Sequence, residues 1–319
     1  MEESIVKADR AEVRASSAPE DSAVIEWFLG RVDVAPKSRE TYSRSLRAWG
    51  SFLQEEGVGV LGATSETVIA YKRRLKEAGR KASTVNTYLT AVRRLYASLE
   101  AESIKPNIAA DVKGERKNPN SPKDALTVDE ARSILMDEPG EGADERALRD
   151  YALVNLLIRR GLRTVEVTRA DVGDLRRVGT KTVLYVQGKG HADKGDFVVM
   201  DEPVLAPIRR YLAERGNPAD TEPLFASVGN RNAGGRMATR TVSRIAKEAM
   251  RGHGIDSAAL TAHSMRHTAV TLALVAGASL QEVQAMARHR NINTTTIYAH
   301  NLDRMEGKAE GAVDSLLAV

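Results

Sequence analysis

The side chains best suited to chemistry on an anionic substrate are concentrated in the last part of the chain. Four of the six histidines fall between residues 263 and 300. His263 and Arg266 stand three residues apart, a spacing that places both on one face of a helix. An arginine stays charged while it binds anionic oxygens, and a histidine can accept or donate a proton near neutral pH. The two side chains could therefore act together at one site.

Three further segments carry groups that suit the same substrate. Arg163 follows a predicted buried helix, and Glu166, one turn later, can hold it rigid. Glycines flank Lys189 and allow a lysine on a tight turn to reach a phosphate. Tyr298 follows His289 by nine residues. Taken alone, each segment has a plainer explanation: a surface salt bridge, a common turn or a packed aromatic ring.

Metal and thiol chemistry are not indicated by the sequence. The chain has no cysteine, which excludes disulfides, thiol catalysis and cysteine-bound zinc. His263 and His267 have the spacing of a zinc-binding pair, but no glutamate follows His263 as the metalloprotease pattern requires. No cluster of carboxylates suits two metal ions. We therefore expect a site without a metal ion or other cofactor.

The first part of the chain has the pattern of a small helical domain. Residues 1–18 are polar and are expected to form a flexible tail, and residues 19–105 contain four segments with apolar residues at helical spacing. Residues 106–124 hold three prolines, three asparagines and many charges, a composition typical of a linker.

The second part, residues 125–319, predicts a mixed domain. Thr127 and Glu130 form a capping-box pattern, and a long apolar helix over about 145–160 ends at Gly161. Residues 182–186 and 197–200 are expected to be the two strands of a β-hairpin. Helices follow from about residue 203 and again from about residue 240. The expected fold is mainly α with a small β-sheet.

Charge is distributed unevenly along the chain, whose net charge is +4. Residues 1–26 carry three basic and seven acidic side chains, whereas residues 31–105 carry fourteen basic and eight acidic ones. This distribution suits a polyanionic partner, although a solvated helical surface would look the same. The predicted contacts to that partner lie on the outer faces of two helices: Lys72, Arg73, Arg74, Arg93 and Arg94. No signal peptide or membrane span is evident, so we expect a cytoplasmic protein.

Together the motifs run G-L-R-x-x-E, G-K-G, H-x-x-R-H, a histidine and then a tyrosine. This order resembles the catalytic signature of the tyrosine recombinases, the family of phage integrases and Xer-type resolvases, and the resemblance extends over the chain from about residue 20. It implies that Glu166 supports Arg163 and that Tyr298 is the nucleophile. By position it implies six catalytic residues: Arg163, Lys189, His263, Arg266, His289 and Tyr298.

The resemblance also implies a fold, an activity and partners. An all-α core-binding domain and a mixed catalytic domain would form a C-shaped clamp on double-stranded DNA. Four copies would assemble on two recombination sites and exchange strands through 3′-phosphotyrosine intermediates and a Holliday junction, near the nucleoid and without a cofactor. An accessory directionality factor is a further expected partner. A separate N-terminal arm-binding domain is not expected.

Two departures from the family pattern and one segment leave questions open. Arg288 stands where the family usually has glycine, and Lys194 is a second lysine in the hairpin loop that could share or replace the role of Lys189. The C-terminal segment 312–319, with Leu316 and Leu317, is expected to form a helix. It could dock on a neighbouring subunit or pack on its own domain.

Several functions fit these observations. The integrase of a mobile element is favoured slightly over a Xer-like dimer resolvase, because the hairpin and Arg288 depart from the Xer pattern. A type IB-like topoisomerase would share the chemistry. Residues 268–298 also resemble a helix-turn-helix, which would make the protein a transcriptional regulator without catalytic activity. That alternative leaves Arg163, Lys189 and Tyr298 unexplained.

Overall fold

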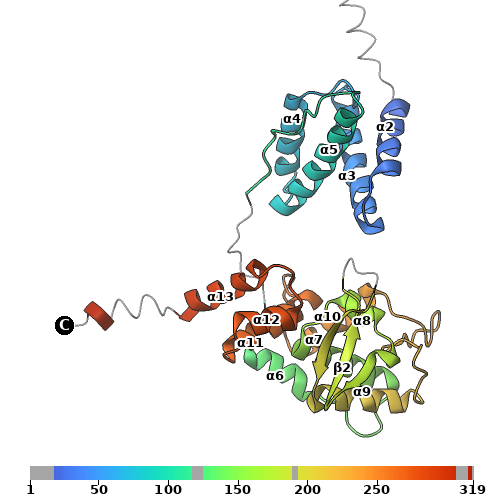
Figure 1. The fold of residues 1–319 in the computed structure, drawn as a ribbon, viewed down its shortest axis with the longest axis vertical. Helices are drawn as coiled ribbons and strands as arrows, with labels where there is room; N and C mark the ends of the chain where they lie inside the picture. Colours follow the sequence, from blue (N-terminus) through green and yellow to red (C-terminus); the bar gives the residue numbers. More distant parts are fainter. Residues whose placement is uncertain (1–17, 117–124, 189–192, 307–314, 318–319) are drawn as a thin grey trace, which may run out of the picture. The chain divides into compact units, whose positions relative to one another are not determined.

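The structure is a computed structural model that describes residues 18–116, 125–188, 193–306 and 315–317. The chain divides into two compact units, the first up to residue 118 and the second from residue 119 (Figure 1). Both are mainly helical, and the only sheet in the described ranges is a small one in the second unit. The expected mainly α fold with a small β-sheet is thereby confirmed.

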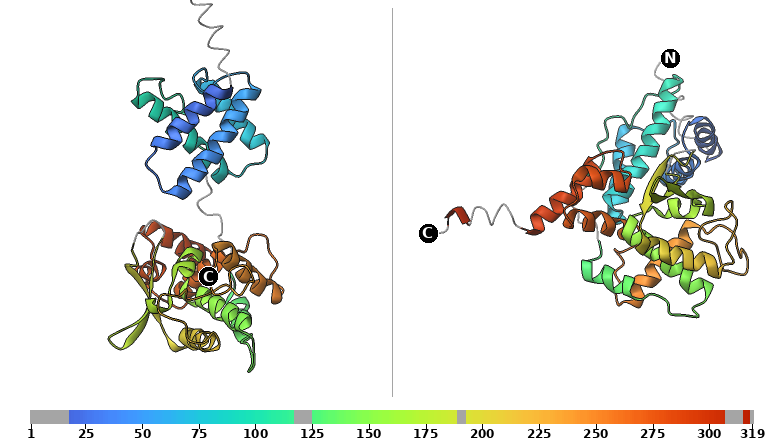
Figure 2. Two further views of the ribbon diagram at one scale, coloured as in Figure 1. Left: turned by 90° about the vertical axis from the view of Figure 1, so that its right-hand side faces the viewer. Right: turned by 60° about the horizontal axis from the view of Figure 1, so that its bottom comes forward.

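The first unit consists of the helices α2 (Ala18–Arg31), α3 (Pro36–Glu55), α4 (Ser65–Glu77) and α5 (Ala82–Ala101) (Figures 1 and 2). Its core is built around Trp49, which is fully buried and lies 5.0 Å from Tyr71, measured between ring centroids. Thr64 caps α4, since its side chain accepts a hydrogen bond from the backbone N–H of Thr67.

The segment after α5 packs on the first unit over more residues than the sequence indicates. Ala109 and Val112 are buried in the core of the first unit. The side chain of Asn86 pairs with both backbone groups of Glu115, donating to its carbonyl at 2.8 Å and accepting from its N–H at 2.7 Å. The predicted linker of residues 106–124 is therefore wrong over its first part. A few small apolar residues are enough to fix this proline- and asparagine-containing segment on the helices.

The second unit begins with α6 (Val128–Met136), α7 (Glu145–Arg160) and α8 (Thr164–Arg169), followed by a 3₁₀ turn, η2 (Val172–Asp174). A three-stranded antiparallel sheet comes next, formed by β1 (Leu175–Val178), β2 (Lys181–Val186) and β3 (Asp196–Met200) in the order β1-β2-β3. The remaining helices are α9 (Glu202–Glu214), α10 (Thr239–Gly252), α11 (Ala262–Val275), α12 (Leu280–Ala287) and α13 (Asn293–Glu306).

The sequence predicts β2 and β3 but not β1. Strand β1 reads Leu-Arg-Arg-Val, and its last three residues are exposed. It pairs with β2 through its backbone, with Leu175 opposite Leu184. Such a strand lacks the apolar alternation on which sequence-based prediction of strands depends.

Helix α7 supplies the core against which the other helices of the second unit are arranged. Nine of its side chains are buried, and it packs against both α9 and α11. The helix ends at Gly161, whose φ of +60° turns the chain sharply into α8. Towards the end of the chain, α11, α12 and α13 enclose a smaller cluster that contains Val270, Val283 and Tyr298.

Replacing Gly161 with alanine should destabilise the second unit by about 2 kcal/mol, because left-handed backbone disfavours a Cβ atom. In addition, the new Cβ would lie 3.0 Å from the Cβ atom of Ala269 on α11. Gly179 provides the matched control, since its φ is also +60° but a Cβ there would meet nothing within 4 Å. Urea unfolding should show a smaller loss for Gly179→Ala. Equal losses would mean that the close approach of α7 and α11 is unimportant.

None of the helices within the described ranges is both long and apolar enough to cross a lipid bilayer. Residues 315–317 form a helical turn, and the side chains of Leu316 and Leu317 are 86% and 67% exposed.

Candidate active site

Arg266 on α11 lies at the centre of the candidate site and is 2% exposed. Its guanidinium donates hydrogen bonds to the carbonyls of Gly161 and Ala287. Gly161 is the C-cap of α7, and Ala287 is the last residue of α12. Burial lowers its pKa to about 9, and the positive charges of Arg163 and Arg288 contribute to the same shift. Three arginines therefore converge on one buried region of the second unit.

Glu166 supplies the negative charge in this cluster and is fully buried. It forms a 2.6 Å ion pair with Nη1 of Arg163 and accepts the backbone N–H of the same residue at 2.8 Å. Burial raises the pKa of Glu166, but the attraction of Arg288 and Arg163 outweighs that effect and holds the pKa below its usual value. Arg163 is thus fixed at the start of α8 by a carboxylate that remains ionised.

Tyr298 lies on α13 and is 4% exposed. Its hydroxyl forms a hydrogen bond with Nδ1 of His267, the last histidine of the H-x-x-R-H string. Burial raises the pKa of Tyr298 to about 12, opposed by the nearby charge of Arg266. The ring of His289 is nearly parallel to that of Tyr298 at 6.5 Å, and Nδ1 of His289 lies 3.0 Å from the hydroxyl oxygen of Thr295.

His263 does not hold the position nearest to the tyrosine. It is exposed, and its ring centroid lies 4.4 Å from that of His267 on the same helix face. His267, which is not among the catalytic residues that the resemblance implies, is therefore the partner of the Tyr298 hydroxyl. The four-residue spacing of His263 and His267, which also suits a zinc-binding pair, is the sequence signal that places the two histidines side by side.

A cavity of about 1080 Å³ opens beside this cluster, between β3 and α12. Cationic side chains from several segments line it: Arg160, Arg163, Arg288 and Arg290. Arg160 is paired with Asp201 at 2.9 Å. His289 also lines the cavity, whereas Arg266 and Tyr298 do not. The cavity has the charge expected of a site that receives an anion.

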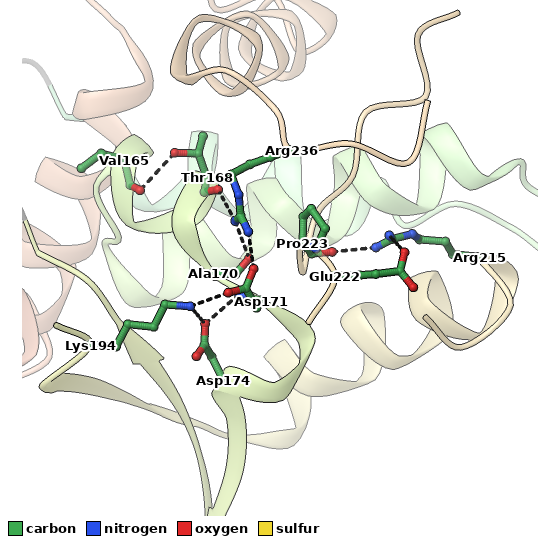
Figure 3. A network of polar contacts seen from close by, with 10 residues as sticks. All are labelled: Val165, Thr168, Ala170, Asp171, Asp174, Lys194, Arg215, Glu222, Pro223 and Arg236. Carbon is green, nitrogen blue, oxygen red and sulfur yellow. Dashed lines mark hydrogen bonds and ion pairs between the residues drawn. The ribbon is translucent and has the colours of Figure 1, made fainter. Parts of the chain in front are cut away.

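Lys189 lies outside the described residues, but the second lysine of the hairpin is placed. Nζ of Lys194 lies 2.6 Å from a carboxylate oxygen of Asp171 and 2.5 Å from one of Asp174 (Figure 3). Arg236 binds the other oxygen of Asp171. Partial burial lowers the pKa of Lys194, but its hydrogen bonds to Asp171 and Asp174 outweigh burial and raise it overall. A lysine held in this way is a poor proton donor.

Because Lys194 is paired with two carboxylates, replacing it with methionine should slow the DNA cleavage that the resemblance implies far less than Lys189→Met does. Lys189 is the expected general acid for the departing 5′ oxygen. A general acid contributes about 10²–10⁴-fold, so Lys189→Met should lose about that much. The comparison can be made with ordinary duplexes and with duplexes that carry sulfur in place of the bridging 5′ oxygen. A thiol leaves without protonation far more easily, its pKa being about 8.5 against about 15.7 for water. We expect sulfur to rescue Lys189→Met, and selective rescue of Lys194→Met instead would contradict the assignment.

The five basic residues predicted to contact a polyanion have different surroundings. Arg73 and Arg94 are exposed. The other three contact their own chain. Lys72 pairs with Glu115 at 3.0 Å and donates to the carbonyl of Lys113, while Arg74 pairs with Glu55 and Arg93 donates to the carbonyl of Val112. The segment after α5 therefore occupies part of the predicted basic surface.

Glu115 neutralises two lysines of α4, since it also lies 3.3 Å from Lys76. Glu115→Gln should increase the affinity for random duplex DNA by about 2–5-fold and make the affinity fall more steeply with salt, because phosphates no longer compete with a carboxylate. Glu102→Gln, an exposed position at the end of α5, changes the net charge equally and serves as control. Identical salt slopes for the two variants would show that these lysines do not meet DNA.

Comparison with known proteins bears directly on this site. Residues 124–305 match the model of the phage integrase family, and residues 29–103 match the N-terminal SAM-like domain of phage integrases. The chain belongs to the phage integrase family. Members of this family are tyrosine recombinases, so the protein is an enzyme that cleaves and rejoins DNA strands.

Relatives of this recombinase cover nearly its full length. Tyrosine recombinase XerD of Rhizobium meliloti strain 1021 is 28% identical over 90% of this chain and 92% of its own. Tyrosine recombinase XerC of Pelobacter propionicus is 30% identical over 86% and 88%. Among solved structures, XerH recombinase in a post-cleavage complex with its difH substrate has a TM-score of 0.72 at 19% identity, covering 93% of this chain and 84% of XerH.

A second kind of recombinase shares the same fold. A fragment of the Tn1549 transposon integrase in complex with transposon right-end DNA has a TM-score of 0.67 at 17% identity, and the match covers 91% of this chain and 98% of that fragment. At this level of identity the similarity establishes the fold alone. Within the described residues of this recombinase, no cluster of three or more histidine, aspartate or glutamate side chains is arranged to hold a metal ion.

Proposed function

We propose that this recombinase is site-specific and that Tyr298 attacks DNA to form a 3′-phosphotyrosine intermediate. The observation that carries the proposal is the convergence of Arg163, Arg266 and Tyr298 in one buried region of the second unit, beside a cationic cavity. Arg163, Lys189, His263, Arg266, His289 and Tyr298 are the proposed catalytic residues.

Two arginines suit the charge that develops during the reaction. A phosphodiester is anionic, and nucleophilic attack adds negative charge to its non-bridging oxygens. Arginines that are already in place stabilise that charge without reorganisation. Arg163 is fixed by Glu166, and Arg266 is fixed by two helix-terminal carbonyls, so neither needs to be ordered when DNA binds.

Tyr298 must lose its proton to attack. With a pKa of about 12, ionising the hydroxyl at pH 7 costs about 7 kcal/mol. Binding of the phosphate must bring the hydroxyl away from His267 and toward the arginines, since Tyr298 does not line the cavity. His267 can accept the proton before the hydroxyl moves, and His263, one turn away on α11, can pass it on to solvent. Lys189 is proposed to protonate the departing 5′ oxygen.

The phosphotyrosine bond conserves the energy of the broken phosphodiester bond. A 5′-hydroxyl from another strand can therefore attack it and restore DNA without ATP. We propose that four copies on two sites perform two such exchanges through a Holliday junction, with the two units of each copy contacting the duplex in the cytoplasm. The exposed Leu316 and Leu317 suit contact with a neighbouring copy.

The biological role has two candidates. Integration of a mobile element agrees with the departures of Arg288 and the hairpin from the Xer pattern. Resolution of chromosome dimers agrees with the XerD and XerC relatives, which match nearly end to end. Cleavage of DNA flanking the protein's own gene, but not of a chromosomal dimer-resolution site, would favour integration. The reverse preference would favour resolution.

Covalent trapping tests the proposed chemistry. The protein is incubated in EDTA with duplexes tiled from both kinds of DNA, each carrying a nick just 3′ to the cleavage position, so that the short fragment released with a free 5′-hydroxyl diffuses away. We expect a denaturation-resistant adduct that retains label placed 5′ to the cut but not label placed 3′ to it. Tight, specific binding without any adduct, on probes that contain the site, would instead indicate a helix-turn-helix regulator.

A further inference from the structure

Arg288 directly follows α12, in the short connection to α13, and its backbone conformation is unusual. Its φ of 53° and ψ of 48° fall in the left-handed region, and among the described non-glycine residues only Ser103 and Asn217 also have a positive φ. Its side chain is only 6% exposed. Left-handed backbone disfavours a residue with a Cβ atom, and burial disfavours a charge. Contacts that compensate for both are therefore expected.

Those contacts lead to Glu166. Nη2 of Arg288 lies 2.7 Å from Oε2 of Glu166, and Nη1 donates to the carbonyl of Met286 at 2.7 Å. The carbonyl of Arg288 itself accepts a hydrogen bond from Nη2 of Arg163 at 3.3 Å. Arg288 thus contacts Arg163 twice, directly through its backbone and indirectly through the carboxylate that both arginines share.

Sharing that carboxylate changes the charge available to a substrate. Three buried or half-buried arginines, Arg163, Arg266 and Arg288, surround the single carboxylate of Glu166. With Arg288 present the group has an excess of two positive charges. Without it, Glu166 would neutralise Arg163 alone, and only one positive charge would remain in excess beside the cavity.

We propose that Arg288 is a positioning residue for DNA cleavage, which holds Glu166 from the side opposite Arg163 and so keeps Arg163 both fixed and effectively charged. This inference rests on the proposed function. The role is distinct from that of Arg266, whose guanidinium contacts backbone carbonyls and not Glu166. His289 follows Arg288 directly, so the same left-handed turn also places the histidine that lines the cavity.

The proposal requires a specific pH dependence. The charged groups that face Glu166 are Arg163 from its own helix, Arg288 after α12 and Arg266 from α11. Removing Arg288 deletes the largest attraction that holds the pKa of Glu166 down, while burial, which raises it, remains. Glu166 should then take up a proton at a higher pH than in the wild type. Protonated Glu166 no longer holds Arg163. As the pH falls, a variant without Arg288 should therefore lose cleavage at a higher pH than the wild type does.

Arg288→Gly is the first variant to test, since glycine accepts the left-handed backbone. Single-turnover adduct formation on nicked duplexes should be about 10–100-fold slower, the effect of a displaced catalytic group, with the affinity for the same DNA changed by less than about 3-fold. In a plot of cleavage rate against pH, the fall in rate on the acid side (the acid limb) should begin at a higher pH than in the wild type. Arg288→Asn is the second variant, because asparagine tolerates this backbone but is too short to reach Glu166.

A double-variant cycle distinguishes positioning from simple packing. In a Glu166→Gln background, Arg288→Gly should slow cleavage by less than about 3-fold, because the two residues act as a unit. Arg215→Met is the matched control. The side chain of Arg215 is also buried, donates to the carbonyl of Pro223 and pairs with Glu222 at 2.8 Å (Figure 3), and it does not line the cavity. It should lower thermal stability without moving the pH profile.

The outcomes separate this inference from the proposed function. The role of Arg288 alone would be overturned by wild-type cleavage rates in both Arg288 variants or by an unmoved acid limb. Equal losses from Arg288→Gly in the wild-type and Glu166→Gln backgrounds would overturn it as well. Failure of the wild type to form any adduct on DNA that it binds specifically would overturn the proposed function instead.

Discussion

Replacing Tyr298 with phenylalanine is expected to abolish the covalent protein–DNA adduct and leave specific DNA binding intact. Phenylalanine keeps the ring that packs between His267 and His289 but has no oxygen to attack phosphorus. No other side chain can restore that bond, so the loss should be complete within detection. The lost hydrogen bond to His267 should lower the free energy of unfolding by only about 1 kcal/mol.

Denaturing gels and peptide mass spectrometry of the trapped adduct provide the measurement. Tyr211→Phe is the matched control, because Tyr211 is also fully buried and its hydroxyl accepts the backbone N–H of Ala226. It should lose similar stability and retain cleavage. An adduct that persists in Tyr298→Phe, or maps to another residue, would show that the nucleophile is not Tyr298.

Replacing Arg266 with lysine is expected to slow cleavage by about 10³-fold, the loss seen when a preorganised donor to the transition state is removed. The guanidinium of Arg266 spans two carbonyls from distant parts of the sequence, those of Gly161 and Ala287. A lysine ammonium is a single point and cannot hold both while it also contacts a phosphate. One carbonyl would be left without its donor.

The same variant should also lose stability. Leaving a buried acceptor unsatisfied costs about 1–3 kcal/mol, which thermal unfolding would detect. Arg149→Lys separates the two effects, since Arg149 is equally buried and donates to the carbonyl of Ala226 and to Asp150. It should be destabilised to a similar degree and still cleave DNA. Loss of cleavage in both variants in proportion to stability would show that Arg266 acts only in folding.

Sequence patterns predicted most of the helices because those patterns are local. Trp49 and Leu53 recur at helical spacing, Thr127 and Glu130 form the capping box that the structure shows, and Gly161 ends α7 in the left-handed conformation. These signals depend on residues within one or two turns of each other. The order of the motifs likewise indicated the family, which the comparisons confirm.

Other features depend on residues that are distant in sequence, and only the tertiary structure decided them. The sequence left open which lysine of the hairpin is available, and the pairing of Lys194 with Asp171 and Asp174 gives a reason to prefer Lys189. It assigned residues 106–124 to a linker, although Val112 reaches the core. It also showed Arg288 as a departure from the family pattern, but gave no sign of its contact with Glu166.

The physical reason is the same in each case. The sequence by itself determined which chemical groups the chain carries and the period with which they recur, and these suffice for helices, caps and the catalytic signature. The contact of Arg288 with Glu166 joins residues 122 positions apart, and that of Tyr298 with His267 joins residues 31 apart. Such contacts depend on how α8, α11, α12 and α13 pack, which no local pattern encodes.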